Sequence, residues 1–168
     1  MPRTLRLTGL KFGWLVWVWL VWSGGVVCAQ QPPTQPMLRL ETGMHTATIR
    51  RISVDAANRY LVTGSEDKTI RVWDLTDGQL IRVLRPPIDS GNEGKIYAVA
   101  ISPDGSTIAA GGWTEPNLEN IYLFDRSSGR LVRRIGGLPN VINHLAYSPD
   151  GSRLAAVLFG GNGLRVIS

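Results

Sequence analysis

Residues 61–74 have the sequence LVTGSEDKTIRVWD. Two short apolar runs in this stretch flank the polar segment Ser65-Glu66-Asp67-Lys68, a pattern that predicts two antiparallel strands joined by a turn. An alternating run at 49–54 precedes the pair, and a further run at 80–84 follows a turn around Asp77-Gly78. Because alternation with a period of two is typical of half-buried strands, residues 49–84 are expected to form four short antiparallel strands.

Turn segments of one kind recur at 55–58, 102–105 and 148–151, at intervals of 47 and 46 residues. The later two copies are Ser-Pro-Asp-Gly, in which Pro fixes φ at the first central position and Gly supplies the positive φ that the turn requires. Asn58 stands at the Gly position of the first copy, where Asn is the next best residue. A period of about 46 residues with four strands fits a β-propeller blade, and no amphipathic segment long enough for a repeat helix follows residue 36.

The first period resembles one nearly complete WD40 repeat, on the strength of Gly43-Met44-His45, of Ile49, Ile52 and Val54, and of residues 61–74 with their final Trp73-Asp74. The resemblance places the structural tetrad of that family on His45, Thr63, Asp67 and Trp73, and it implies a buried hydrogen-bond chain that ends on the indole. It covers residues 37–168 and implies an all-β fold: a partial WD40-like β-propeller of three repeats, with four-stranded antiparallel blades, that is not closed.

The three units are expected at approximately 37–78, 79–129 and 130–168. The second and third units depart from the tetrad, with the substitutions Asn92, Ala110 and Phe124 in the second and Leu138, Ala156 and Ile167 in the third. Apolar packing is therefore expected to replace the polar chain in the third unit. Asn162-Gly163 is expected to form a tight type I′ hairpin turn.

Closed propellers have about four to eight blades, so three repeats are not expected to close a ring. The unpaired strand edges at 37–40 and 164–167 would then be adhesive. Two interpretations follow: the chain is a truncated relative of a longer WD40 protein, or it forms a homo-oligomer that completes a propeller. Longer bacterial WD40 proteins of similar appearance are sometimes joined to a caspase-like peptidase domain.

The amino terminus has the pattern of an export signal. Basic residues precede an apolar run from Phe12 to Trp22, and small residues end at Ala29, which predicts a signal peptide at 1–29 and a proline-rich linker at 30–36. An exported protein, periplasmic or secreted, is expected. The alternative is an uncleaved membrane anchor, because residues 12–29 carry no charge and reach the lower limit of a membrane span.

Composition excludes several function classes. Three of the 18 basic residues lie in the predicted signal, and from residue 30 onward 15 basic residues face 13 acidic ones, which argues against nucleic-acid binding. Cys28 is the only cysteine and would leave with the signal, so the mature chain is expected to have no thiol for a disulfide, a zinc site or a nucleophile.

No catalytic, metal or cofactor site is predicted. His45 has a structural role by its motif position, and His144 is a lone strand histidine without the further ligands that a metal needs. Glu115 and Glu119 are loop acids without a fixed geometry. The glycine clusters at 91–95 and 160–163 are not followed by a helix, so they are interpreted as turns and not as phosphate loops.

One loop is longer than the corresponding connections of the other units. Residues 113–120 form a long connection that contains Trp113, Pro116 and Leu118, and long loops with an aromatic residue often contact a partner. The sequence therefore predicts a scaffold that binds a protein partner and has no catalytic activity. The alternatives are a truncated gene fragment and the regulatory part of a peptidase-linked or quinoprotein-type propeller enzyme.

Overall fold

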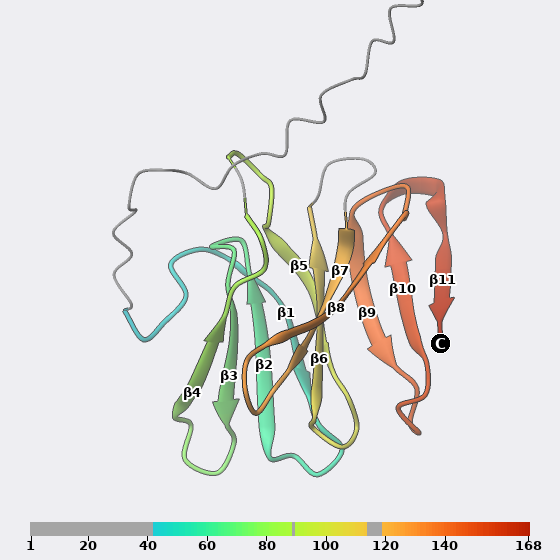
Figure 1. Cartoon of the computed structure of the whole chain (residues 1–168). Helices are drawn as coiled ribbons and strands as arrows, with labels where there is room; N and C mark the ends of the chain where they lie inside the picture. Colours follow the sequence, from blue (N-terminus) through green and yellow to red (C-terminus); the bar gives the residue numbers. More distant parts are fainter. Residues whose placement is uncertain (1–41, 89, 114–118) are drawn as a thin grey trace, which may run out of the picture. The chain divides into compact units, whose positions relative to one another are not determined.

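The computed structural model describes residues 42–88, 90–113 and 119–168. Eleven strands form three antiparallel sheets, and the prediction of an open, all-β, partial propeller is confirmed (Figure 1). The first sheet has the order β1-β2-β3-β4, with β1 Ile49–Val54, β2 Tyr60–Ser65, β3 Ile70–Asp74 and β4 Leu80–Leu84. The second has the order β5-β6-β7-β8, with β5 Ile96–Ile101, β6 Thr107–Gly112, β7 Glu119–Asp125 and β8 Leu131–Gly136. The third has the order β11-β10-β9, with β9 Ile142–Tyr147, β10 Leu154–Leu158 and β11 Leu164–Ile167.

Sheets and sequence units are offset from each other. Strand β4 falls in the sequence unit that begins at residue 79, but it is hydrogen-bonded to β3 of the first sheet. In the same way β8 falls in the unit that begins at 130 and pairs with β7. Both strands follow tight turns that continue the antiparallel ladder, so each of the first two sheets takes its last strand from the following unit.

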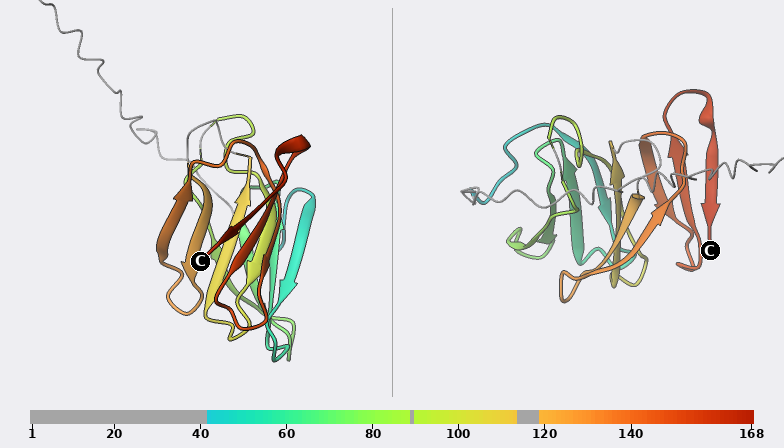
Figure 2. Two further views of the ribbon diagram at one scale, coloured as in Figure 1. Left: turned by 90° about the vertical axis from the view of Figure 1, so that its right-hand side faces the viewer. Right: turned by 45° about the horizontal axis from the view of Figure 1, so that its top comes forward.

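The three sheets stack face to face, with their first strands β1, β5 and β9 beside one another (Figures 1 and 2). Val62, Ile70 and Val72 of the first sheet pack with Ile108 and Phe124 of the second in one buried cluster. Alanines of the second sheet pack with β9 and β10 in another. Strands β2 and β6 bury consecutive residues. In β5, alternate residues supply the two clusters, with Val99 and Ile101 in the first and Ala98 and Ala100 in the second.

The recurring turns have the backbone that their residues favour. Gly105 and Gly151 each have φ of +74°, and Asn58 at the equivalent position has φ of +52°. The turns also join neighbouring sheets, because the Ala56 N–H donates to the Pro103 carbonyl at 3.1 Å and Arg59 Nη2 donates to the Asp104 carbonyl at 2.8 Å. The repeat of turn residues therefore contributes to the stacking as well as to each hairpin.

The prediction of a type I′ turn at Asn162-Gly163 is wrong. Residues 159–163 connect β10 to β11, and Gly160–Asn162 form a short 3₁₀ helix. A type I′ turn needs positive φ at both central residues, but here Gly160 and Gly163 have positive φ and Asn162 does not. The Asn162 side-chain amide instead donates to the Phe159 carbonyl at 2.9 Å, which stabilises the longer connection.

The predicted signal peptide, the linker and the strand edge at 37–40 lie outside the described residues. Within the described ranges, no helix is long and apolar enough to cross a membrane.

Acid is expected to destabilise the fold through three turn aspartates. Hydrogen bonds from Ser102, Ser128 and Ser148 hydroxyls are the largest causes that lower the pKa of Asp104, Asp125 and Asp150, respectively, from 3.8 to about 2. A lowered folded-state pKa contributes stability above the unfolded value, and this stability is lost as the pH falls through the folded value. We expect the Tm to be constant above about pH 5 and to fall between about pH 4 and pH 2. Circular dichroism melts measure this, and a Tm that does not change over that range would contradict the turn geometry.

Candidate functional site

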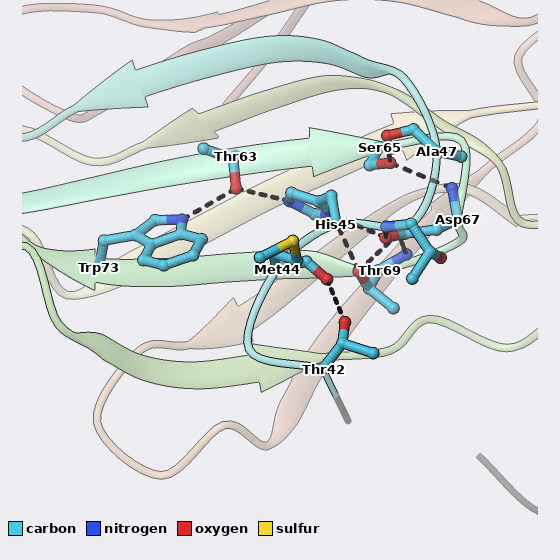
Figure 3. Close-up of polar contacts among 10 residues, drawn as sticks. Thr42, Met44, His45, Ala47, Thr63, Ser65, Asp67, Thr69 and Trp73 are labelled. Atoms are coloured by element: carbon cyan, nitrogen blue, oxygen red, sulfur yellow. Dashed lines mark hydrogen bonds and ion pairs between the residues drawn. The ribbon is translucent and has the colours of Figure 1, made fainter. Parts of the chain in front are cut away.

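Four side chains of the first sheet form a continuous hydrogen-bond chain (Figure 3). The Trp73 indole N–H on β3 donates to Thr63 Oγ1 on β2 at 3.0 Å, and the same oxygen lies 2.7 Å from His45 Nε2. His45 Nδ1 lies 2.8 Å from Asp67 Oδ2 in the β2–β3 turn. Because a carboxylate only accepts, Nδ1 carries the proton, and a neutral imidazole then accepts the Thr63 hydroxyl proton at Nε2. The structure thus brings together all four residues that the resemblance singled out.

The Asp67 carboxylate has several donors besides His45. The Thr69 hydroxyl donates at 2.6 Å and the Thr69 N–H at 2.9 Å, while the Thr46 N–H donates at 3.0 Å. Burial raises the pKa of Asp67, but the hydrogen bonds from Thr69, His45 and Thr46 outweigh it and lower the pKa below its usual value. The side chains of His45 and Asp67 are only 3% and 6% exposed. A saturated and buried pair of this kind suits a structural role better than acid–base chemistry.

The other two units have apolar side chains at the same positions, except for Asn92. Ala110 and Phe124 are buried between the first and second sheets, and Asn92 is exposed. Ala156 and Leu138 are buried in the cluster of the third sheet, and Ile167 packs against that cluster. Packing between the sheets therefore occupies the place of the polar chain.

Of the predicted partner loop, the structure describes Trp113 and the β7 backbone from residue 119. Pro116 and Leu118 lie outside the described residues, as does Glu115. Trp113 is held on the neighbouring strand connection, because its N–H donates to the Lys95 carbonyl at 3.0 Å and its carbonyl accepts from the Gly94 N–H at 3.1 Å. Its side chain is 40% exposed, so the indole is available on the surface.

Trp113 lines a cavity of about 630 Å³ that sequence reasoning did not predict. Its other lining residues come from β1, β5, the start of β9 and the end of β10: Arg50, Arg51, Tyr97, Asn140, Val141, Asn143 and Phe159. They are far apart in the sequence and meet because the first strands of the three sheets lie side by side. Aromatic residues just after the second strand of two units, Trp113 and Phe159, are the signal that could have indicated it.

The lining of this cavity carries more positive than negative charge. Arg50 pairs with Glu66 and lies over the Tyr97 ring, 5.3 Å from its centroid, and Lys95 Nζ lies 3.4 Å from the same Glu66 carboxylate. Burial raises the pKa of Glu66, but the hydrogen bonds and charges of Arg50 and Lys95 outweigh it and lower the pKa. Among the cavity's described lining residues there are two arginines and no carboxylate.

His144 lies on β9, where it is paired with Val157 of β10. Burial and the charge of Arg51 lower its pKa, so the neutral imidazole is favoured. Over the described ranges, His, Cys, Asp and Glu side chains form no group of three or more that could hold a metal ion.

Part of the chain matches a known protein family, and several known proteins are similar to it. Residues 37–74 and 78–114 match the WD40 family model, described as WD domain, G-beta repeat. The chain is 34% identical over 96 residues to the small ribosomal subunit protein RACK1y of Oryza sativa, a match covering 57% of this chain and 26% of that protein. It is 30% identical to rat Coronin-7 over 148 residues, which cover 84% of this chain and 16% of Coronin-7. It is 27% identical over 126 residues to the guanine nucleotide-binding protein subunit beta of Zea mays, a match covering 74% of this chain and 32% of that protein. The chain thus spans less than a third of the length of these relatives.

Proposed function

We propose that this chain, in which residues 37–74 and 78–114 are WD40 repeats, is a scaffold that binds a protein partner and has no catalytic activity of its own. The observation that carries the proposal is the cavity at the junction of the three first strands, with its exposed Trp113 and Phe159 and its unequal charge. Exposed aromatic and arginine side chains in a recess are typical of binding hot spots. The buried pair of His45 with Asp67 is fully engaged in the hydrogen-bond chain.

The names of the relatives support this function class. RACK1y is named as a protein of the small ribosomal subunit, the maize relative as a subunit of a guanine nucleotide-binding protein, and a yeast relative as a subunit of translation initiation factor 3. Each of these names describes a component of a larger assembly. A fold hosts many functions, so the partner of this chain follows from its own surface and not from these names.

The place of action is proposed from the amino-terminal pattern alone. Basic residues followed by an uncharged apolar run support export to the periplasm or the exterior of a bacterial cell. If the segment stays uncleaved, it holds the scaffold at the membrane. In a longer protein with a peptidase domain, the same scaffold would act as a regulatory part.

A second candidate partner is another copy of the chain. Ile52 on β1 is 61% exposed, and Val166 on β11 is 57% exposed, and these residues lie on the outer faces of the first and third sheets. Sheet faces that carry exposed aliphatic residues favour packing against another sheet. Light scattering after size exclusion is expected to give a discrete oligomer, and Val166→Lys is expected to reduce its mass. A monomer for both parent and variant would rule out self-assembly.

The scaffold function is tested by selecting peptides from a random display library against the full chain. We expect the selected peptides to share a sequence pattern and to lose binding when Trp113 is changed to Ala. Ile81→Ala serves as the matched control, because Ile81 is also 40% exposed but lies on β4, away from the cavity. Selection that yields no common pattern would contradict a binding function.

A further inference from the structure

The positive charge in the cavity is concentrated on Arg51. Its Nη2 donates to the Asn143 carbonyl at 3.2 Å, whereas its Nε is buried and has no hydrogen-bond partner among the described residues. No carboxylate of the described residues pairs with Arg51, while Arg50 and Lys95 share Glu66. A partly enclosed guanidinium without a counter-charge favours binding of an anion, since charge-assisted hydrogen bonds to carboxylates are the strong ones.

The apolar part of the same cavity is open to the surface. Phe159 is 62% exposed and Trp113 is 40% exposed, and they directly follow β10 and β6, respectively. These two strands end on the same side of the stack (Figure 1). Tyr97 and Val141 complete the apolar lining. A volume of about 630 Å³ lies within the range of about 300–1,000 Å³ that is usual for ligand pockets, so it accommodates more than one side chain.

We propose that this cavity binds an acidic peptide segment of the partner, in which a carboxylate lies next to a large apolar side chain. The carboxylate pairs with Arg51, and the apolar side chain packs between Trp113 and Phe159. Asn140 and Asn143 also line the cavity, and side-chain amides can both donate to and accept from a peptide backbone. This inference rests on the proposed scaffold function and specifies the chemistry of its partner.

A second cavity of the described residues has a different balance of charge. It has a volume of about 420 Å³, lies between the second and third sheets, and is lined by Asp104, Asp150, Arg133 and Arg153. Two aspartates there stand with two arginines, so its lining has no net charge to select an anion. The excess of positive charge belongs to the cavity around Arg51.

The proposal is tested by fluorescence anisotropy with the full chain and a short labelled peptide in which aspartates flank a Leu-Phe pair. We expect saturable binding that weakens about tenfold or more when the aspartates are replaced by asparagines, or when Arg51 is changed to Ala. Phe159→Ala is expected to weaken binding by a similar factor, because it removes an apolar wall. Arg130→Ala is the matched control, since Arg130 is an exposed arginine outside the cavity, and its binding is expected to equal the parent's.

The proposal fails if the charged peptide does not bind, or if the charged and uncharged peptides bind equally. It also fails if a folded Arg51→Ala binds the charged peptide as tightly as the parent. If Arg51→Ala does not fold, Phe159→Ala and the uncharged peptide decide the question. A further contrary result is that inorganic phosphate displaces the labelled peptide while a peptide with Gly-Gly in place of Leu-Phe binds equally well. That result would overturn the peptide proposal and assign the site to a phosphate group. If display selection yields a common pattern without acidic residues, the scaffold function stands and the acidic-peptide proposal fails.

Discussion

Replacing Asp67 with Ala is expected to lower the free energy of unfolding by about 3 kcal/mol, because the partly buried donors of His45 and Thr69 and the exposed Thr46 N–H lose their acceptor at once. In the folded chain His45 Nδ1, the Thr69 hydroxyl and the Thr46 N–H all bind this carboxylate. Without it, the imidazole loses the group that orients it toward Thr63, so the bond to the Trp73 indole weakens as well. Urea unfolding followed by circular dichroism measures the change.

The matched control is Asp77→Ala. Asp77 is exposed and its carboxylate accepts one bond, from the Gln79 N–H at 2.9 Å, so its removal is expected to cost less than about 1 kcal/mol. Unfolding of Asp67→Ala at the same urea concentration as the parent would mean that the four-residue chain does not stabilise the first sheet.

Gly112→Ala is expected to cost about 3 kcal/mol or to prevent folding, because overpacking against backbone cannot be relieved by a side-chain rotation. A Cβ at this position would lie 1.9 Å from the Lys95 carbonyl oxygen and 2.8 Å from the Tyr97 backbone nitrogen. Gly112 is paired with Ile96, next to an irregularity in the β5–β6 ladder, so the clash would separate these two strands. The yield of soluble protein and its Tm are the measurements.

Gly161→Ala is the control for this substitution. Gly161 has φ of −77°, and a Cβ there would have no atom within 4 Å, so the variant is expected to have the same Tm as the parent. If Gly112→Ala also melted with the parent, the close approach of β5 and β6 would be contradicted.

The features that sequence predicted are those set by local chemistry. The turns at Asn58, Gly105 and Gly151 depend on a positive φ that few residues tolerate, so their recurrence indicated the period and the four-strand unit. The apolar runs of β2 and β3 indicated core side chains such as Val62, Ile70 and Val72. The alternation along β1 did not, because Ile49, Ile52 and Val54 are exposed. His45, Thr63, Asp67 and Trp73 were singled out by the resemblance to WD40 repeats, and they lie together.

The cavity around Arg51 was not predicted, because it depends on how separate sheets stack. Arg51 and Asn143 are 92 positions apart, and no local pattern relates a residue of β1 to one of β9. The connection at 159–163 was mispredicted for a related reason. Asn-Gly favours a two-residue turn, but here the ladder ends at the pair Val157–Leu164, and a five-residue connection with a 3₁₀ turn spans the end of the hairpin.

Hydrogen exchange of the full chain, with and without a peptide selected from the display library, tests the binding function most directly. We expect exchange to slow at the strands and turn that line the cavity, residues 49–54, 96–101 and 140–147, while β4 and β8 exchange as before. Unchanged exchange in the three lining segments, or slowing confined to β4 and β8, would contradict a partner site at the junction of the first strands.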